Sequence, residues 1–394
     1  MAKNISVGID IGTYQIKVVV VEGVKENDRQ SHKIIGTGFA ESKGLRHGYI
    51  INTIDTSFSL KKAIAQAEKT SGIKIKKALL SIGGIGVSGV VSHGSMVIPR
   101  ADSEITEMDV KSVLNIAESE IPANLSVNRK IIHTIPIAYK IDSRPVLGKP
   151  VGMKGIKFET KALFITCLEH HLEDIIEVVE GLDIEVVNIM ASPLAGGLVT
   201  LTKTQKIAGC VLANIGSETV SVVVYENNIP ISLEIFPIGG TDITNDIALG
   251  LKIPLEEAED IKINDGREDL CPKKKLDEII VARLSDIFEL IEAHLKKIGR
   301  SGLLPAGIIL TGGTSGVSTI EDMAKATLRL PSKVASLNFT TDLKNCQIKD
   351  SSWSVAYGLC IWGLSDGEDV PLGAPAGTGI RTNKFFGWLK QFLP

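Results

Sequence analysis

The chain has 394 residues, which is too long for a single hydrophobic core, so we expect two or more domains. Hydrophobic residues make up 44% of it and aromatic residues only 5%, a composition typical of soluble α/β proteins, and no apolar run is long enough to span a membrane. The formal net charge of −3 argues against general binding to nucleic acid.

The first predicted domain opens with a strand, a glycine turn and a second strand over residues 4–23. Because the chain runs directly into this hairpin, we expect no signal peptide. The five cysteines are scattered without a C-x-x-C pair, which indicates reduced thiols in the cytoplasm. The later elements of this domain are predicted at residues 33–39 (strand), 55–70 (helix), 78–82 (strand) and 169–180 (helix). His170 and His171 begin the last helix, where we expect them to cap it or to face solvent.

A separate unit is predicted over residues 85–165, after a glycine-rich patch at 83–89. Thr106 and Asp109 form a capping box, in which a hydroxyl and an acid three residues later satisfy free N–H groups at the start of a helix. Strands are predicted on both sides of this helix, at residues 87–98, 130–141 and 157–167. The pattern indicates a compact α+β module inserted within the first domain.

The second domain begins with another strand–turn–strand unit after residue 209. The elements predicted after it are helices at 246–251, 255–263 and 277–298, a strand at 307–315 and a helix at 319–328. Lys273–Lys275 follow a proline and are expected in a solvated loop. The segment 366–383 is rich in Gly, Pro and Asp without periodicity, which is typical of a flexible linker.

The two strand–turn–strand units are versions of one another. Asp10–Gly23 (DIGTYQIKVVVVEG) aligns with Asn214–Asn227 (NIGSETVSVVVYEN). This internal repeat predicts two related domains that face each other across a cleft. Three glycine turns follow predicted strands, at Gly12-Thr13, Gly216-Ser217 and Gly312-Gly313-Thr314. Backbone N–H groups in such turns can approach an anion, so the pattern favours a nucleotide held between two lobes.

The last residues, 384–394, have the pattern of an interfacial membrane helix. At 100° per residue the apolar side chains share one arc about 160° wide, with basic and small residues opposite. A helix that packs on its own domain is the alternative. The apolar residues of this pattern are Phe385, Phe386, Trp388, Leu389, Phe392 and Leu393.

The order of these motifs resembles that of the actin/Hsp70/hexokinase ATPase superfamily, and within it the FtsA family of bacterial cell-division proteins. The superfamily motifs are DIGT at Asp10–Thr13, the N/D-x-G turn at Asn214, AExxK at Ala258–Lys262 and LTGG at Leu310–Gly313. The family-specific segments are Glu104–Val110, His133–Asp142, Pro150–Gly155, Gly239–Ala248 and the apolar tail. The resemblance covers nearly the whole chain.

The resemblance implies an α/β, actin-like two-lobed ATPase fold, built of duplicated ribonuclease-H-like domains with a small inserted α+β domain. Its subdomains would be 1–84 with 166–205 (1A), 85–165 (1C), 206–242 with 302–365 (2A), 243–301 (2B), the linker 366–383 and the membrane-targeting helix 384–394.

The resemblance also implies a site for ATP or ADP with Mg²⁺. Asp10 would orient Mg²⁺ through water, while Thr13 and Lys17 would contact phosphate; a solvated strand lysine is the alternative for Lys17. Glu259 and Lys262 would reach adenosine, unless they form a surface ion pair. The full set is Asp10, Gly12, Thr13, Tyr14, Lys17, Asn214, Gly216, Ser217, Gly240, Glu259, Lys262, Gly312, Gly313 and Thr314.

The second turn departs from the superfamily pattern Asp-x-Gly-Gly-Gly-Thr. Asn214 replaces the carboxylate, and Ser217 and Glu218 replace two glycines. Because a carboxylate near Mg²⁺ supports metal binding and water activation, we expect nucleotide to be bound but hydrolysed slowly or not at all. We also expect Glu218 to place a negative charge near phosphate.

The family implies a protein that polymerises on the cytoplasmic face of the cell membrane at the division site. It would bind the C-terminal peptide of the tubulin-like protein FtsZ through its second lobe, with Arg283 as a contact, and recruit later divisome membrane proteins. An ordinary surface arginine is the alternative for Arg283. A pilus-assembly adaptor and a catalytic ATPase or kinase of the same superfamily remain the alternative functions.

Overall fold

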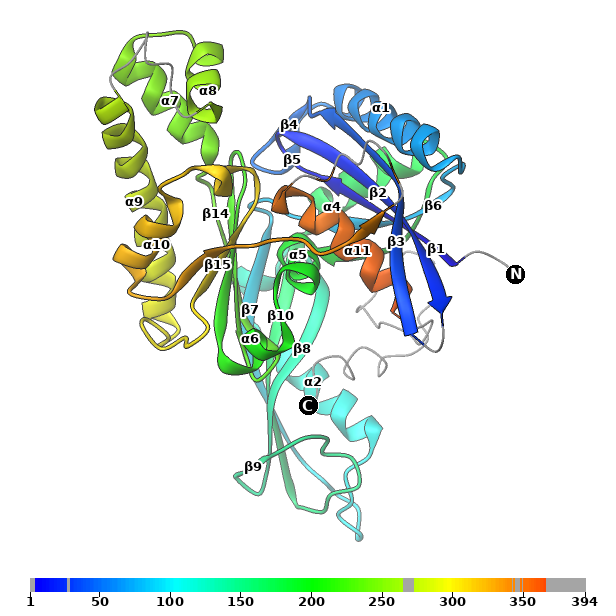
Figure 1. The fold of residues 1–394 in the computed structure, drawn as a ribbon. Coiled ribbons are helices and arrows are strands. Elements are labelled where there is room, and N and C mark those ends of the chain that lie inside the picture. The colour runs from blue at the N-terminus through cyan, green and yellow to red at the C-terminus, as the bar shows by residue number, and fades with distance from the viewer. Residues whose placement is uncertain are drawn as a thin grey trace.

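The computed structural model describes residues 4–365, apart from 27–28, 265–272, 342, 344–347 and 349. Two lobes, each built on a β-sheet, lie side by side, and a smaller module projects beneath them (Figure 1). The predicted linker 366–383 and the predicted membrane helix 384–394 lie outside the described residues. Among the helices of the described residues, none is long and apolar enough to cross a membrane.

The sheet of the first lobe has six strands in the order β11-β6-β1-β2-β3-β17. Its central hairpin is rich in valine, and Val18–Val21 are fully buried because helices cover both faces of the sheet. The strands are β1 (Asn4–Ile11), β2 (Gln15–Glu26), β3 (Arg29–Glu41), β6 (Lys77–Ile82), β11 (Glu185–Ala191) and β17 (Thr340–Thr341). The helices on this lobe are α1 (Thr53–Ser71), α4 (Glu169–Glu180), α5 (Ser192–Thr200) and α11 (Ser354–Leu364), and a small hairpin joins β4 (Leu45–Arg46) to β5 (Tyr49–Ile50).

The sheet of the second lobe repeats five positions of the first, in the order β16-β15-β12-β13-β14. In both lobes the first hairpin is antiparallel and its opening strand pairs in parallel with a later strand. The strands are β12 (Cys210–Ile215), β13 (Val220–Glu226), β14 (Ile229–Phe236), β15 (Ile308–Thr311) and β16 (Ser332–Val334). The duplication therefore extends well beyond the repeated sequence.

The helices of the second lobe gather at its outer end and along its sheet (Figure 1). They are α6 (Lys203–Ala208), α7 (Gly240–Leu251), α8 (Leu255–Ile263), α9 (Lys273–Lys297) and α10 (Ile320–Leu328). The prediction of a loop at Lys273–Lys275 was wrong, because α9 already begins at Lys273, four residues before the predicted start of the helix. Apolar residues of α9 from Leu276 to Leu295 join the core of this lobe.

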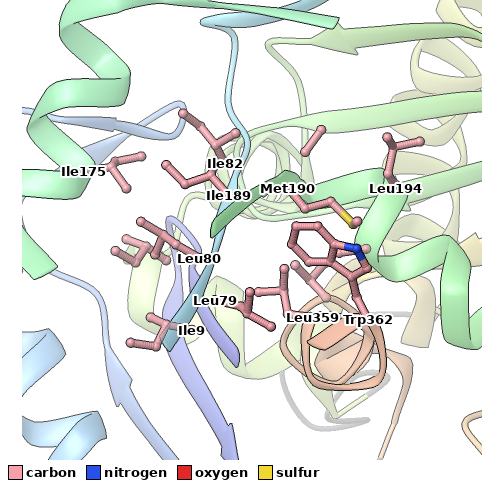
Figure 2. Packing of buried hydrophobic residues seen from close by; sticks show 14 of the residues in the cluster. Ile9, Leu79, Leu80, Ile82, Ile175, Ile189, Met190, Leu194, Leu359 and Trp362 are labelled. Carbon is pink, nitrogen blue, oxygen red and sulfur yellow. The ribbon is translucent and has the colours of Figure 1, made fainter. Parts of the chain in front are cut away.

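The end of the described chain returns to the first lobe, whereas residues 302–365 were predicted as second-lobe core. β17 pairs in parallel with β3, at the edge of the first sheet. Leu359 and Trp362 of α11 pack beside Leu79 and Met190 of the first lobe (Figure 2). Sequence periodicity shows that a helix has an apolar face but not which sheet it covers.

Helix α11 approaches its neighbours closely enough to require glycine at two contacts. A Cβ atom at Gly8 of β1 would lie 2.2 Å from the carbonyl oxygen of Ala356, and one at Gly358 would lie 1.9 Å from that of Ala195 in α5. Backbone therefore packs on backbone where α11 meets β1 and α5.

The inserted module is a sheet in the order β7-β10-β8-β9 with one main helix on it. The predicted capping box is present: the Thr106 hydroxyl accepts from the Asp109 amide, and the Asp109 carboxylate accepts from the Thr106 amide. Arg100 pairs with the same carboxylate and, as the main cause, lowers the pKa of Asp109 to about 2. The elements are β7 (Val87–Val97), β8 (Arg129–Ile141), β9 (Arg144–Val146), β10 (Lys157–Leu168), α2 (Glu107–Ser119) and α3 (Ala123–Ser126).

A buried histidine joins this module to the first lobe and makes stability depend on pH. His133 of β8 accepts a hydrogen bond from the backbone amide of Ala191 at 3.1 Å, and burial lowers the pKa of His133 from 6.5 to about 3. As the pH falls, the His133 side chain is therefore protonated in the unfolded chain before it is protonated in the folded chain. The contribution of His133 to stability is complete above pH 6.5 and is lost as the pH falls toward 3.

We predict that His133→Gln flattens the dependence of the free energy of unfolding on pH between about 6.5 and 4, because it removes one of the groups whose protonation differs between states. Urea titrations across this range measure the slope. His93→Gln, at an exposed position of β7, is the matched control and should keep the wild-type slope. Equal slopes for all three proteins would contradict the prediction. Part of the slope should remain, because burial also lowers the pKa of His294, to about 4.

Candidate functional site

A cavity of about 610 Å³ lies between the two lobes, where the first hairpin of each sheet ends. The structure brings all fourteen predicted nucleotide-site residues to the wall of this cavity, five from the first lobe and nine from the second. These residues are Asp10, Gly12, Thr13, Tyr14, Lys17, Asn214, Gly216, Ser217, Gly240, Glu259, Lys262, Gly312, Gly313 and Thr314.

The first-lobe wall carries a pair of opposite charges. Asp10 and Lys17 face each other across the β1–β2 hairpin. The Ser81 hydroxyl donates to Asp10 Oδ1 at 2.7 Å, and Lys17 Nζ donates to the backbone oxygen of Ser352 at 3.0 Å. Burial raises the pKa of Asp10 and lowers that of Lys17, while each residue's charge opposes the shift of the other. Lys17 is therefore no solvated strand lysine.

The second-lobe wall has a neutral pair at the corresponding place. Asn214 faces Ser221 across the β12–β13 hairpin, in the register that Asp10 and Lys17 occupy in the first lobe. Both members of the charged pair are thus replaced, and neither position carries a charge. At this position the second-lobe hairpin can offer an amide and a hydroxyl, but no carboxylate, to a bound metal or water.

Three hydrogen bonds fix the second glycine turn. The backbone amide of Gly240 donates to the Gly216 carbonyl at 2.9 Å, and that of Thr241 donates to the Ser217 carbonyl at 2.7 Å. The Thr314 hydroxyl also donates to the Gly216 carbonyl, at 3.0 Å. Thr314 and the start of α7 therefore hold the turn in place as well as lining the cavity.

Glu259 and Lys262 form a largely buried network rather than a surface ion pair. Lys262 Nζ donates to Glu259 Oε2 at 2.6 Å, to the Thr244 hydroxyl at 2.8 Å and to the Gly240 carbonyl at 3.1 Å. An ammonium group has three donors, so protein acceptors already satisfy all of them. The Lys262 side chain is only 11% exposed, and it ties α8 to the start of α7.

Glu218 does not stand where we expected it. Its carboxylate accepts a hydrogen bond from the backbone amide of His47 in the first lobe, and it is absent from the cavity wall. The expectation that Glu218 places its charge in the cavity was therefore wrong, because its side chain reaches across to the other lobe. A contact between residues this distant in sequence has no local signature.

Several lining residues escaped the sequence analysis. Gly83 and Gly84 were visible only as part of a glycine-rich patch, which was interpreted as a domain boundary. Gly48 packs against Gly84, and a Cβ atom on Gly48 would lie 2.4 Å from the Cα of Gly84. Ser192 begins α5 and Ser352 lies in a short 3-10 helix just before α11; neither belongs to a motif, and only the tertiary fold brings them to the cavity.

His171 supports this glycine wall from behind. It is fully buried, and its Nε2 lies 2.9 Å from the Gly83 carbonyl, so the expectation of a solvent-facing or capping role was wrong for His171. Burial is the main cause that lowers its pKa, which keeps the ring neutral with Nε2–H as the donor. His170, in contrast, is exposed.

The donor set fits a nucleotide with its magnesium ion. The volume lies within the usual range of small-ligand sites, and an anionic phosphate would meet glycine turns and an ammonium group. Mg²⁺ commonly keeps several waters and binds through one or two carboxylates together with phosphate oxygens. Asp10 can supply such a carboxylate. Among the described residues there is no cluster of three or more His, Cys, Asp or Glu that could hold a metal ion by themselves.

Comparison with known proteins gives two family matches and close relatives. The family described as cell division protein FtsA matches residues 211–358, and the SHS2 domain inserted in FtsA matches residues 84–166. The cell division protein FtsA of Pseudomonas aeruginosa is 30% identical over 388 residues, covering 92% of this chain and 90% of that protein.

Solved structures of similar fold include the PilM–PilN type IV pilus biogenesis complex, with a TM-score of 0.67 and 16% identity over 91% of this chain and 98% of that chain. MreB5 of Spiroplasma citri bound to ADP has a TM-score of 0.51 and 13% identity over 91% of this chain and 96% of that chain. At these identities the likeness concerns the fold alone. It confirms the predicted actin-like architecture, and the matched SHS2 domain confirms that a small domain is inserted in it.

We predict that Gly312→Ala lowers the free energy of unfolding by about 2–4 kcal/mol. Gly312 has φ +93°, and a Cβ atom there would lie 2.4 Å from Asn214 Oδ1 and from the Ile215 carbonyl oxygen. The matched control is Gly313→Ala, where a Cβ atom meets nothing within 4 Å, and we expect it to change stability by at most about 0.5 kcal/mol. Chemical denaturation measures both. Similar effects of the two substitutions would contradict the prediction.

Proposed function

We infer, because this chain belongs to the FtsA family of bacterial cell-division proteins, that it is an actin-like ATP-binding protein that polymerises on the inner face of the cytoplasmic membrane. It tethers FtsZ to this membrane at the division site and recruits later divisome proteins there. The observation that carries the nucleotide part is a single cavity to which both lobes contribute glycine turns, with a carboxylate and an ammonium group in its wall.

In this proposal, Asp10 and Lys17 receive the opposite charges of Mg·ATP. Lys17 would donate to a phosphate oxygen while remaining close to Ser352, and Asp10 would accept from water on the metal. Mg²⁺ would supply charge neutralisation on the phosphates. The Glu259–Lys262 network would shape the adenosine side, because it fixes the start of α7 and faces the cavity. ADP would occupy the same cavity, as a structure of similar fold, MreB5, is bound to ADP.

Hydrolysis is weak or absent in this proposal, because the second hairpin lacks a base. A carboxylate there could orient and deprotonate an attacking water, whereas the Asn214 amide carries no negative charge. Its partner Ser221 is also neutral. Nucleotide then serves as a structural ligand or a switch, which disfavours the alternative of a catalytic ATPase or kinase.

The FtsZ contact proposed for Arg283 must compete with an existing ion pair. Arg283 of α9 donates from Nε to Asp246 Oδ2 at 2.6 Å and from a terminal nitrogen to Asp246 Oδ1 at 3.0 Å. Asp286 lies 3.2 Å away on the other side. The Arg283 side chain is only 28% exposed. In the described structure its role is therefore to join α9 to α7. A carboxylate of the FtsZ peptide would bind here by displacing Asp246 from one face of the guanidinium group.

The membrane part of the proposal rests on the sequence of residues 384–394. One short amphipathic segment would bind lipid reversibly, but many copies on one filament would bind far more firmly through avidity. The inserted module would mediate self-association and contact later divisome proteins. A pilus-assembly adaptor remains the second candidate, since the PilM–PilN complex shares the fold.

We predict that the full-length protein binds Mg·ATP in calorimetry but releases phosphate more slowly than about 1 s⁻¹, below the rates of most enzymes. Asn214→Asp should speed phosphate release about tenfold or more, because it restores a carboxylate beside the metal. Asn245→Asp adds the same charge elsewhere in the cavity wall and should not. Wild-type turnover at ordinary enzyme rates, unchanged by Asn214→Asp, would contradict the proposal.

We predict that deletion of residues 384–394 abolishes co-sedimentation of the protein, and of added FtsZ, with anionic lipid vesicles. Trp388→Glu should act like the deletion, because it places a charge in the apolar arc, whereas Gln391→Glu on the polar side should retain binding. The assay is run with and without ATP. Membrane association that survives the deletion would contradict the tether proposal.

A further inference from the structure

We propose that Glu218 is an inter-lobe clasp, a positioning residue of the second lobe that holds the first lobe against it before any ligand binds. Its influence on nucleotide rests on the function proposed above, but the clasp itself is a contact within the protein.

Two contacts link Glu218 to a single residue of the first lobe. The Glu218 carboxylate accepts a hydrogen bond from the backbone amide of His47, and His47 Nδ1 lies 3.2 Å from the backbone oxygen of Glu218. Both residues are half-buried. A hydrogen bond to an ionised acceptor is about twice as strong as one between neutral groups, so this contact outweighs an ordinary turn contact.

On the first lobe, the clasp joins a wall of the cavity. His47 lies in the turn between β4 and β5 with φ +48°, followed by Gly48 with φ +87°. The His47 carbonyl accepts from the backbone amide of Ile85 at 3.2 Å, and Gly48 packs on Gly84. The clasped turn therefore rests on the loop that lines the cavity and leads into β7 of the inserted module.

On the second lobe, Glu218 belongs to the glycine turn that α7 and Thr314 fix in place. The Gly216 and Ser217 carbonyls accept three hydrogen bonds from these elements, so the turn has little freedom to follow a moving side chain. Each end of the clasp is thus anchored in a wall of the same cavity. The bond between Glu218 and His47 therefore joins these two walls directly.

Because both partners of this bond belong to the protein, the clasp needs no nucleotide to hold the two walls together. A ligand that enters a preformed site need not drive the closure, so binding is stronger, but the difference between free and bound conformations is smaller. Removal of the clasp should have the opposite effect on both. The protein without the carboxylate would be open when empty and would close when Mg·ATP binds.

Hydrogen–deuterium exchange of the ligand-free, full-length protein tests the clasp. In Glu218→Ala we expect exchange to be about tenfold faster in the turn that contains His47 and in residues 83–87, because the shared anchor is lost. Glu218→Gln retains an oxygen acceptor without the charge and should lie between. Glu173→Ala, at an exposed position of α4, is the matched control and should exchange like the wild type.

A second measurement separates positioning from local structure. Calorimetry should give a Mg·ATP affinity about tenfold lower for Glu218→Ala, with partial rescue in Glu218→Gln. Addition of Mg·ATP should restore protection in Glu218→Ala and change the wild type little. The clasp is overturned if the ligand-free Glu218→Ala protein exchanges at the same rate as the wild type. It is also overturned if the faster exchange is confined to residues 216–220. If no variant binds Mg·ATP, the proposed function fails, and the ligand-free exchange still decides the clasp.

Discussion

The packing of α11 against β1 and α5 is the contact on which the two-lobed arrangement depends. It works at backbone distance, because Gly8 and Gly358 leave no side chain between the elements. Helix α5 touches strands of both sheets, so α11 fixes the helix that both lobes share. Ser192 and Val355, near the starts of these two helices, line the cavity. The geometry of the site is therefore set by a crossing that lies beneath it.

Above this crossing, the duplicated hairpins produce a cavity of unequal halves. The first half keeps the opposite charges of Asp10 and Lys17, and the second replaces both by the neutral pair Asn214 and Ser221. A buried hairpin tolerates either a balanced pair or a neutral one, whereas a single charge would be costly. The two changes are thus coupled by electrostatics, and the sequence comparison of Asp10 with Asn214 saw only half of the exchange.

Local sequence patterns located the two hairpins and the three glycine turns, whereas the resemblance to the family supplied the actin-like architecture and assigned Glu259 and Lys262 to the site. Buried valine-rich strands, glycine turns at strand ends and the repeat of one hairpin place the site residues wherever the two copies face each other. The failures share another cause. Glu218 reaches a residue 171 positions away, His171 turns inward toward Gly83, and α11 leaves the lobe that precedes it in the chain. Each depends on which surfaces meet in space, which periodicity does not encode.

The inserted module leaves and re-enters the first lobe at neighbouring points, since the amide of Leu168 bonds to the Gly86 carbonyl across its base. Such an insertion could in principle be cut out and its ends rejoined. Here, however, β7 also contacts β14 of the second lobe, and a Cβ atom at Gly89 would lie 2.7 Å from the Leu233 carbonyl oxygen. Leu233 and Ile235 share one apolar cluster with Leu163 and Ile165 of the module. An excised protein would therefore be damaged in the lobe to which the module is not covalently joined, so the module is an integral part of the molecule despite its modular topology.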